Sequence, residues 1–140
     1  MEVQRVADKE RRGRTVLLLA GDWLALGLFV VLGQLEHSLL DENAVSRLLR
    51  GMAEFVLPWS VVAFVMRAHL WRAEQTAVDF LARSLNAWLV AAPLALVIRA
   101  MLRGQATIPV LFILVTVGLG GVFLLAWRAI YVIWQRRKIS

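Results

Sequence analysis

Four long apolar runs, separated by short polar segments, dominate the pattern of the sequence. The runs cover about residues 15–35, 55–70, 80–101 and 109–134. A hydrocarbon core about 30 Å thick needs roughly 20 helical residues to cross it. Each run is therefore a candidate membrane span, although the second is short. The pattern predicts an all-α fold, a four-helix transmembrane bundle embedded in a lipid bilayer.

A different pattern occupies the polar segment between the first two runs. Val45, Leu48, Leu49 and Met52 recur at the spacing i, i+3, i+4, i+7, and polar residues lie between them. This spacing places the apolar side chains on one face of a helix. We therefore expect a short amphipathic interfacial helix in the first outer loop, lying on the membrane surface.

Composition narrows the class of protein. The 140 residues are 60% hydrophobic and carry a net charge of +6, and none is a cysteine. The absence of cysteine excludes disulfides and thiolate metal sites. The basic residues cluster in residues 1–14, in the tail at 135–140 and between the apolar runs, where membrane topology alone would place them. We therefore expect no nucleic-acid partner.

The same charges predict an orientation. Four spans place both termini on one side, and that side holds twelve of the 16 Lys and Arg residues, against four on the other. The positive-inside rule makes the side of twelve cytoplasmic. We therefore expect a prokaryotic inner-membrane protein with a cytoplasmic N-terminal segment (1–14) and a cytoplasmic C-terminal tail. Aromatic belts predict Trp71, Trp127, Tyr131 and Trp134 near the inner interface and Trp59 near the outer one.

One acidic residue lies within the first run. Asp22 is about seven residues, or about 10 Å, along that helix, and Arg128 has a similar depth in the fourth run. An intramembrane carboxylate is a functional-site hypothesis by default. Two interpretations stay open: an ion pair that fixes the helices, or a group that couples to a proton or a substrate.

A second basic pair lies at the outer end of the third run. Arg99 and Arg103 share one helix face at i, i+4, and Glu36 or Glu54 could pair with them. The pair is a candidate outer-face site for an anion or a lipid headgroup. The alternative is that both side chains only reach to the interface.

Small residues mark candidate helix contacts. Gly21 and Ala25 form one small-xxx-small pair, and Gly118 and Gly121 lie in the middle of the fourth run. Small residues let membrane helices approach closely. We expect these four positions to pack within the bundle or between protomers.

The sequence offers little for catalysis. The two histidines, His37 and His69, are predicted at opposite membrane faces, so they cannot share one metal or haem. No Ser-His-Asp set, HExxH motif or glycine-rich phosphate loop is evident. We expect no catalytic residue, no metal and no cofactor.

Eleven positions along the chain form a recognisable pattern: Asp22, Phe29, Gly33, His37, Pro58, Trp59, Trp88, Arg99, Gly104, Trp127 and Arg128. This pattern resembles the uncharacterised prokaryotic membrane family called domain of unknown function 3054. The resemblance covers roughly residues 15–131 and departs at Gln34, where a basic residue is expected, and at Ala126, where glycine is expected. It implies four helices and no established activity, and it makes Asp22, His37, Arg99 and Arg128 the polar positions to test first.

Two functional hypotheses follow. The first is a non-catalytic accessory or assembly subunit, or a small homo-oligomer, because the chain has almost no extramembrane domain and carries small-residue packing surfaces. The alternative is a small dimeric proton-coupled transporter that uses Asp22. Small multidrug exporters also have four short helices with one acid in the first, but they lack an obvious arginine partner for it.

Overall fold

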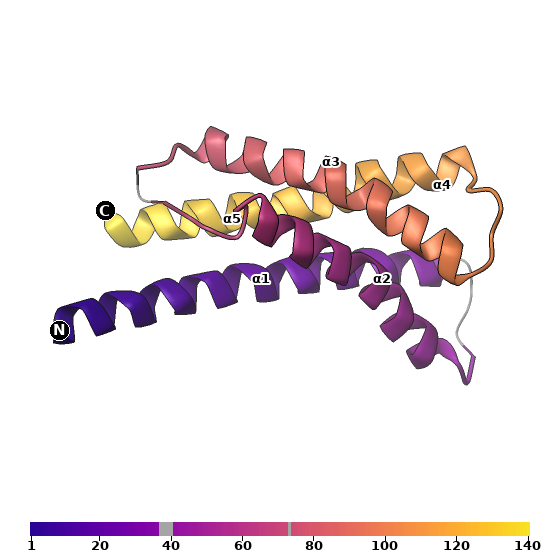
Figure 1. Cartoon of the computed structure of the whole chain (residues 1–140), viewed down its shortest axis with the longest axis horizontal. Helices are drawn as coiled ribbons and strands as arrows, with labels where there is room; N and C mark the ends of the chain where they lie inside the picture. The colour runs from indigo at the N-terminus through magenta and orange to yellow at the C-terminus, as the bar shows by residue number, and fades with distance from the viewer. Residues whose placement is uncertain (37–40, 73) are drawn as a thin grey trace.

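The computed structural model is an all-α bundle that describes residues 1–36, 41–72 and 74–140 (Figure 1). No strand occurs within those ranges. Four helical segments are long and apolar enough to cross a membrane, which confirms the predicted four-helix fold class. The elements are α1 (Glu2–Glu36), α2 (Ala44–Val65), α3 (Ala77–Leu102), α4 (Val110–Val115), the π-helical turn η1 (Thr116–Gly120) and α5 (Gly121–Ile139), of which the last three form one continuous span.

Successive spans run in opposite directions through the bundle. Both termini and the connection between α2 and α3 lie at one end, which we call the terminal end (Figure 1). The start of α2 and the connection between α3 and α4 lie at the other, the far end. α2 packs against α1 and α3, and α5 packs against the same two helices. All four spans therefore meet around a shared interior.

The amphipathic segment after the first span differs from its prediction. It is helical, but it forms the first turns of α2 and not a separate interfacial helix. The reason is packing: Leu48 and Met52 lie against Phe29, Val30 and Phe55, whereas the first two residues of α2 remain accessible. As a result the second span begins at 44 and ends at 65, earlier at both ends than the apolar run.

A local hydrogen-bond network lies just before α2. The carboxylate of Asp41 accepts a hydrogen bond from the backbone N–H of Asn43 and two from the Arg47 guanidinium, at 2.7 and 3.0 Å. The Arg47 hydrogen bond is the main cause that lowers the pKa of Asp41 below its usual value. Asp41 thus links the residue just before α2 to the first turn of that helix.

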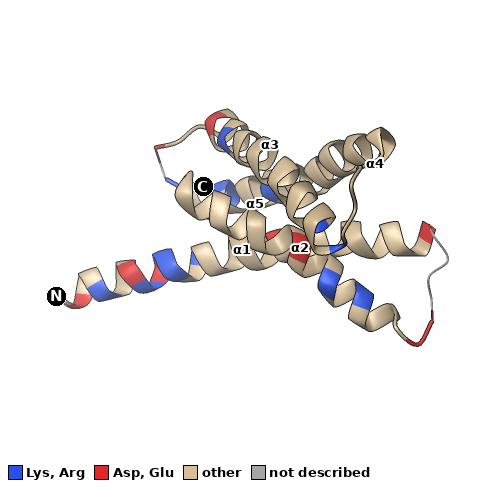
Figure 2. Ribbon diagram, turned by 45° about the vertical axis from the view of Figure 1, so that its right-hand side comes forward, with Lys and Arg blue, Asp and Glu red and all other residues tan. Residues whose placement is uncertain are grey.

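α1 is longer than a bilayer requires. Its 35 residues span about 52 Å at 1.5 Å per residue, against about 30 Å of hydrocarbon. Its first turns carry most of its charges and project from the terminal end (Figure 2). The predicted basic segment 1–14 is therefore an exposed extension of the first helix.

The interior is built around aromatic side chains. Trp59 and Trp88 are almost completely buried, and their rings meet edge to face with centroids 6.1 Å apart. Leu26, Val62 and Leu124 belong to the same cluster, which joins α1, α2, α3 and α5. This cluster lies next to the most buried charged residues of the chain.

Candidate functional site

Asp22 and Arg128 form a buried ion pair in the structure. Both side chains are 0% exposed. Arg128 donates from Nη2 to Asp22 Oδ2 at 2.6 Å and from Nε to Asp22 Oδ1 at 3.0 Å. This two-pronged geometry is the strong form of an arginine–carboxylate pair. The structure thus brings together the two intramembrane charges that the sequence placed at similar depth.

The remaining contacts of the pair come from α2 and α3. Trp59 Nε1 donates to Asp22 Oδ2 at 3.1 Å. Arg128 Nη1 donates to the Ala68 carbonyl at 2.6 Å and to Ser84 Oγ at 2.8 Å. The guanidinium also lies over the rings of Trp59 and Phe80, 4.9 and 5.3 Å from their centroids, at a distance typical of cation–π contacts. We call these six residues the buried cluster.

The buried cluster uses the C-terminal end of α2. The N–H of Ala68 donates to the Ala63 carbonyl and the N–H of Arg67 to the Phe64 carbonyl, which is a Schellman motif. Arg67 occupies the left-handed position of this motif, with φ of 55°, where glycine is usual. The turn directs the Ala68 carbonyl to Arg128. A strained turn without glycine therefore supplies one hydrogen-bond acceptor for the buried guanidinium.

Sequence reasoning did not find the contributions of Trp59, Ala68 and Ser84. Trp59 was predicted at the outer interface, and that prediction is wrong because its side chain is 0% exposed and contacts both charges. The signal was weak, since tryptophan is frequent both in interfacial belts and in packed interiors. The Ser84 hydroxyl also donates to the Phe80 carbonyl, and no sequence motif predicts this local hydrogen bond.

Two glycine–tryptophan contacts hold the helices around this cluster. A Cβ added at Gly21 would overlap the Trp127 ring, and one added at Gly121 would lie 2.9 Å or less from Trp88. Each indole N–H reaches a carbonyl: Trp127 donates to Leu18 at 3.1 Å and Trp88 to Val117 at 2.9 Å. Gly21 and Gly121 therefore pack within the bundle.

The other two predicted packing positions differ from these. Ala25 is only partly buried. Gly118 is exposed, and a Cβ added there would meet nothing within 4 Å. Within the described chain, Gly118 thus presents a small-residue surface outward and makes no contact inside the bundle that requires glycine.

A second acid–arginine cluster lies toward the far end. Glu54, whose side chain is 2% exposed, pairs with Arg99 Nη1 at 2.5 Å and with Arg103 through Nε at 3.2 Å and Nη2 at 3.1 Å. The two arginines are 21% and 30% exposed. Of the two acids proposed from sequence, the structure places Glu54 against them. We call these three residues the far-end cluster, which carries a net charge of +1.

An apolar groove runs beside the far-end cluster. It has a volume of about 400 Å³ and lies between α2 and α3, and its lining combines apolar side chains, such as Leu57, Val61, Leu94 and Ile98, with Arg50 and Glu54. Its lining and its neighbouring cations agree with the predicted anion or lipid site at Arg99 and Arg103, which stays a prediction.

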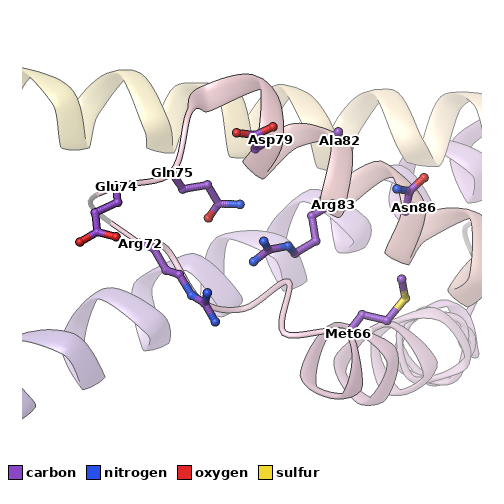
Figure 3. Close-up of a pocket in the computed structure, with 8 residues that line it drawn as sticks. All are labelled: Met66, Arg72, Glu74, Gln75, Asp79, Ala82, Arg83 and Asn86. Atoms are coloured by element: carbon purple, nitrogen blue, oxygen red, sulfur yellow. The ribbon is translucent and has the colours of Figure 1, made fainter.

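A more polar hollow, the polar pocket, lies near the terminal end. It has a volume of about 500 Å³, and Figure 3 shows its lining side chains. Neither this pocket nor the apolar groove is lined by Asp22 or Arg128. The polar pocket is therefore separate from the buried cluster, although both draw on α3.

The histidines remain apart from these sites. His69 lies beside the Ala63 carbonyl, 3.1 Å from Nδ1, and stacks on Phe64, while His37 lies outside the described residues. Within the part of the chain that the structure describes, no three His, Asp or Glu side chains gather in a way that could hold a metal ion. The candidate chemistry therefore rests on the acid–arginine clusters and the two hollows.

Comparison with known proteins places this geometry in a family. A search of curated proteins found no match, and neither did a search of solved structures. The family model described as "Protein of unknown function (DUF3054)" matches residues 19–131, a range that includes both acid–arginine clusters. Because the match covers most of the chain, the protein belongs to the DUF3054 family.

Proposed function

We propose that this chain is a non-catalytic multi-pass protein of a prokaryotic cytoplasmic membrane, acting as an assembly subunit for another membrane protein or as a small homo-oligomer. In this proposal the buried cluster is structural. Asp22 accepts three hydrogen bonds and Arg128 donates four, all among fully buried partners from four helices. An ion pair with so many buried hydrogen bonds is better suited to fixing the helices in place than to exchanging protons.

The observation that carries the proposal is the uneven burial of the fourth span. Its most apolar window is 22% buried, against 33–44% for the other three, and α4 has no buried residue. Exposed apolar side chains alone need no partner in lipid, because lipid tails are equally apolar. Gly118 provides independent support for a partner at this face, because an outward-facing glycine in a span lets another helix approach closely. We propose that this face contacts the partner.

Oligomeric state in mild detergent tests this interface. Gly118→Leu should abolish the complex or reduce it at least tenfold, because a branched side chain blocks close approach. Gly33→Leu is the matched control: Gly33 is also an exposed glycine of a span with nothing within 4 Å of an added Cβ, but on α1. A wild-type chain that is monomeric and co-purifies with no protein contradicts the proposal, as does a complex that survives Gly118→Leu.

The proposed orientation places both termini in the cytoplasm. The twelve-to-four division of Lys and Arg supports it, and the termini share one end of the bundle with the connection between α2 and α3 (Figure 1). Because the chain has no cysteine, single cysteines give a clean test. Ser46→Cys should react with an impermeant reagent from outside the cell, and Ser140→Cys only after the membrane is opened. The reverse pattern overturns the orientation.

A proton-coupled transporter that uses Asp22 is the alternative, and the intramembrane carboxylate is the observation in its favour. Such a carboxylate needs access to water, whereas Asp22 is 0% exposed and lines neither described hollow. Substrate-driven proton release from the purified protein that is lost in Asp22→Asn would favour the transporter. No release with any candidate substrate favours the structural role.

A further inference from the structure

The polar pocket occupies the space beyond the end of α2. That helix stops at Val65, and residues 66–72 and 74–76 form a non-helical segment that runs toward the terminal end. The pocket lies between this segment and the first turns of α3, which Figure 3 shows above it. In Figure 3, Met66 and Asn86 line the side of the pocket away from Glu74, and Arg72, Gln75 and Arg83 lie between these two sides.

Two arginines from opposite walls point into the pocket. Arg72 comes from the non-helical segment and Arg83 from α3, and their guanidinium groups extend toward the same space (Figure 3). Among the ion pairs of the described residues, none involves either side chain. By contrast, Arg99, Arg103 and Arg128 are each paired with a carboxylate. Two like charges that converge without an acid between them favour an anionic ligand.

Gln75 contributes the second observation. Both its amide nitrogen and its amide oxygen are buried, and neither has a hydrogen-bond partner within the described structure. Leaving a buried polar group unpaired is costly, so such a group marks a place where a ligand is expected. Figure 3 shows the Gln75 side chain extending from the non-helical segment toward Arg83.

Two acids, Glu74 and Asp79, also line the pocket but, among the described residues, do not pair with its arginines. Asp79 is held in the N-cap of α3, where its carboxylate accepts from Thr76 Oγ1 at 2.6 Å and its N–H donates to the same oxygen at 3.1 Å. Glu74 is exposed at the mouth of the pocket. Two arginines and two acids thus line the pocket, and neither acid forms an ion pair with Arg72 or Arg83 in the part of the chain that the structure describes.

We propose that the polar pocket binds a phosphate group. The forked guanidinium groups of Arg72 and Arg83 match phosphate oxygens, and the Gln75 amide N–H adds a third donor. The Gln75 oxygen can accept from a hydroxyl carried next to the phosphate. Two sources share this chemistry: the headgroup of an anionic phospholipid and a soluble phosphate ester. The site is independent of the proposed assembly role.

Thermal unfolding of the full chain in an uncharged detergent tests the site and separates the sources. One series adds inorganic phosphate against chloride at constant ionic strength. A second adds short-chain phosphatidylglycerol against phosphatidylcholine of the same chain length. We expect the unfolding midpoint to rise with at least one of the two phosphate probes. A rise with inorganic phosphate indicates a soluble ester, and a rise with phosphatidylglycerol alone indicates the lipid headgroup. No rise with either overturns the proposal.

Three charge-matched variants localise the effect. Arg72→Gln and Arg83→Gln should each weaken the apparent affinity at least tenfold, whereas Arg136→Gln should leave it unchanged. Arg136 is exposed at the same end of the bundle but outside the pocket. Because Arg72 lies outside the helices, its variant remains informative if the α3 variant fails to fold. Affinity that survives either pocket substitution, or that falls equally in the control, overturns the site.

Discussion

The two acid–arginine clusters use the same chemistry in opposite surroundings. In the buried cluster one carboxylate meets one guanidinium, both side chains are 0% exposed, and all four spans contribute. In the far-end cluster one carboxylate of α2 meets two guanidinium groups from the end of α3 that are 21% and 30% exposed, and the ring of Phe112 in α4 lies 5.1 Å from Arg99. The first is electrically balanced and closed, and the second is cationic and open. Position in the bundle thus separates a structural pair from a candidate anion site.

The clusters also lie beside two helix ends of the same type. α3 ends in a Schellman motif in which Gly104 has φ of 62°, and Arg103 of the far-end cluster is its capping residue. α2 ends in the same motif with Arg67 in the left-handed position, and it delivers the Ala68 carbonyl to the buried cluster. The buried cluster therefore depends on a turn in which arginine occupies a position that favours glycine, whereas the turn beside the far-end cluster has glycine there.

The largest predicted effect comes from opening the buried cluster. Asp22→Ala leaves the Arg128 guanidinium buried without its carboxylate, so the free energy of unfolding should fall by about 3–5 kcal/mol. Because that is a large part of the stability of a small domain, much of the protein should fail to assemble. Titration with sodium dodecyl sulfate in mixed micelles, followed by helical circular dichroism, measures the loss.

The matched control replaces both charges. Asp22→Leu combined with Arg128→Met removes the buried charges together, and the double variant should recover most of the stability lost in the single one. A double variant as unstable as Asp22→Ala would show that Trp59, Ala68 and Ser84 hold the helices only through the ions.

The second prediction removes one hydrogen bond of the buried cluster. Trp59→Phe keeps an aromatic ring near Arg128 but deletes the indole N–H that donates to Asp22. A hydrogen bond to a charged group contributes about 2 kcal/mol, so the same detergent titration should show a loss of that size. Trp23→Phe is the control, because Trp23 on α1 donates to Ser60 on α2 but is 48% exposed. Equal losses in the two variants would contradict a special role for burial.

The third prediction makes a comparable change in the open cluster. Glu54→Gln removes the only carboxylate that the described structure gives to Arg99 and Arg103. Since both guanidinium groups are partly exposed, we expect a loss of about 1 kcal/mol, smaller than for either change above. The loss should shrink at high salt, because added ions screen the two arginines. Glu36→Gln should change little. A loss as large as that of Asp22→Ala would contradict the distinction between the clusters.

Run length and depth explain what the sequence predicts well. Four spans follow from apolar runs long enough to cross a bilayer. The pairing of Asp22 with Arg128 follows from their similar depth, because an isolated charge inside the membrane is too costly to leave unpaired. Glu54 was one of two candidate partners for the arginines, and only the structure selects it. These predictions succeed because charges are rare in such helices.

The contributions that sequence reasoning missed depend on tertiary contacts. Val56, Trp59 and Val62 share the buried face of α2, while Leu57 and Val61 on its other side are exposed and equally apolar. In a membrane helix the periodicity of apolar residues therefore does not reveal which face is the interior. The end of α2 at Val65 was missed for another reason, since the apolar run continues past it and no glycine marks the turn.

The smallest predicted effect concerns that turn. Arg67→Gly should relieve the cost of a left-handed arginine, about 1–2 kcal/mol, but it also adds about 0.5–1 kcal/mol of chain entropy to the unfolded state. We expect a net gain of about 0.5 kcal/mol in the free energy of unfolding. Gly104→Ala at the equivalent position of α3 should instead lose stability, because alanine cannot adopt that φ without strain. If Arg67→Gly destabilises the protein, the arginine side chain itself must hold the end of α2, and the Ala68 carbonyl reaches Arg128 through more than the backbone turn.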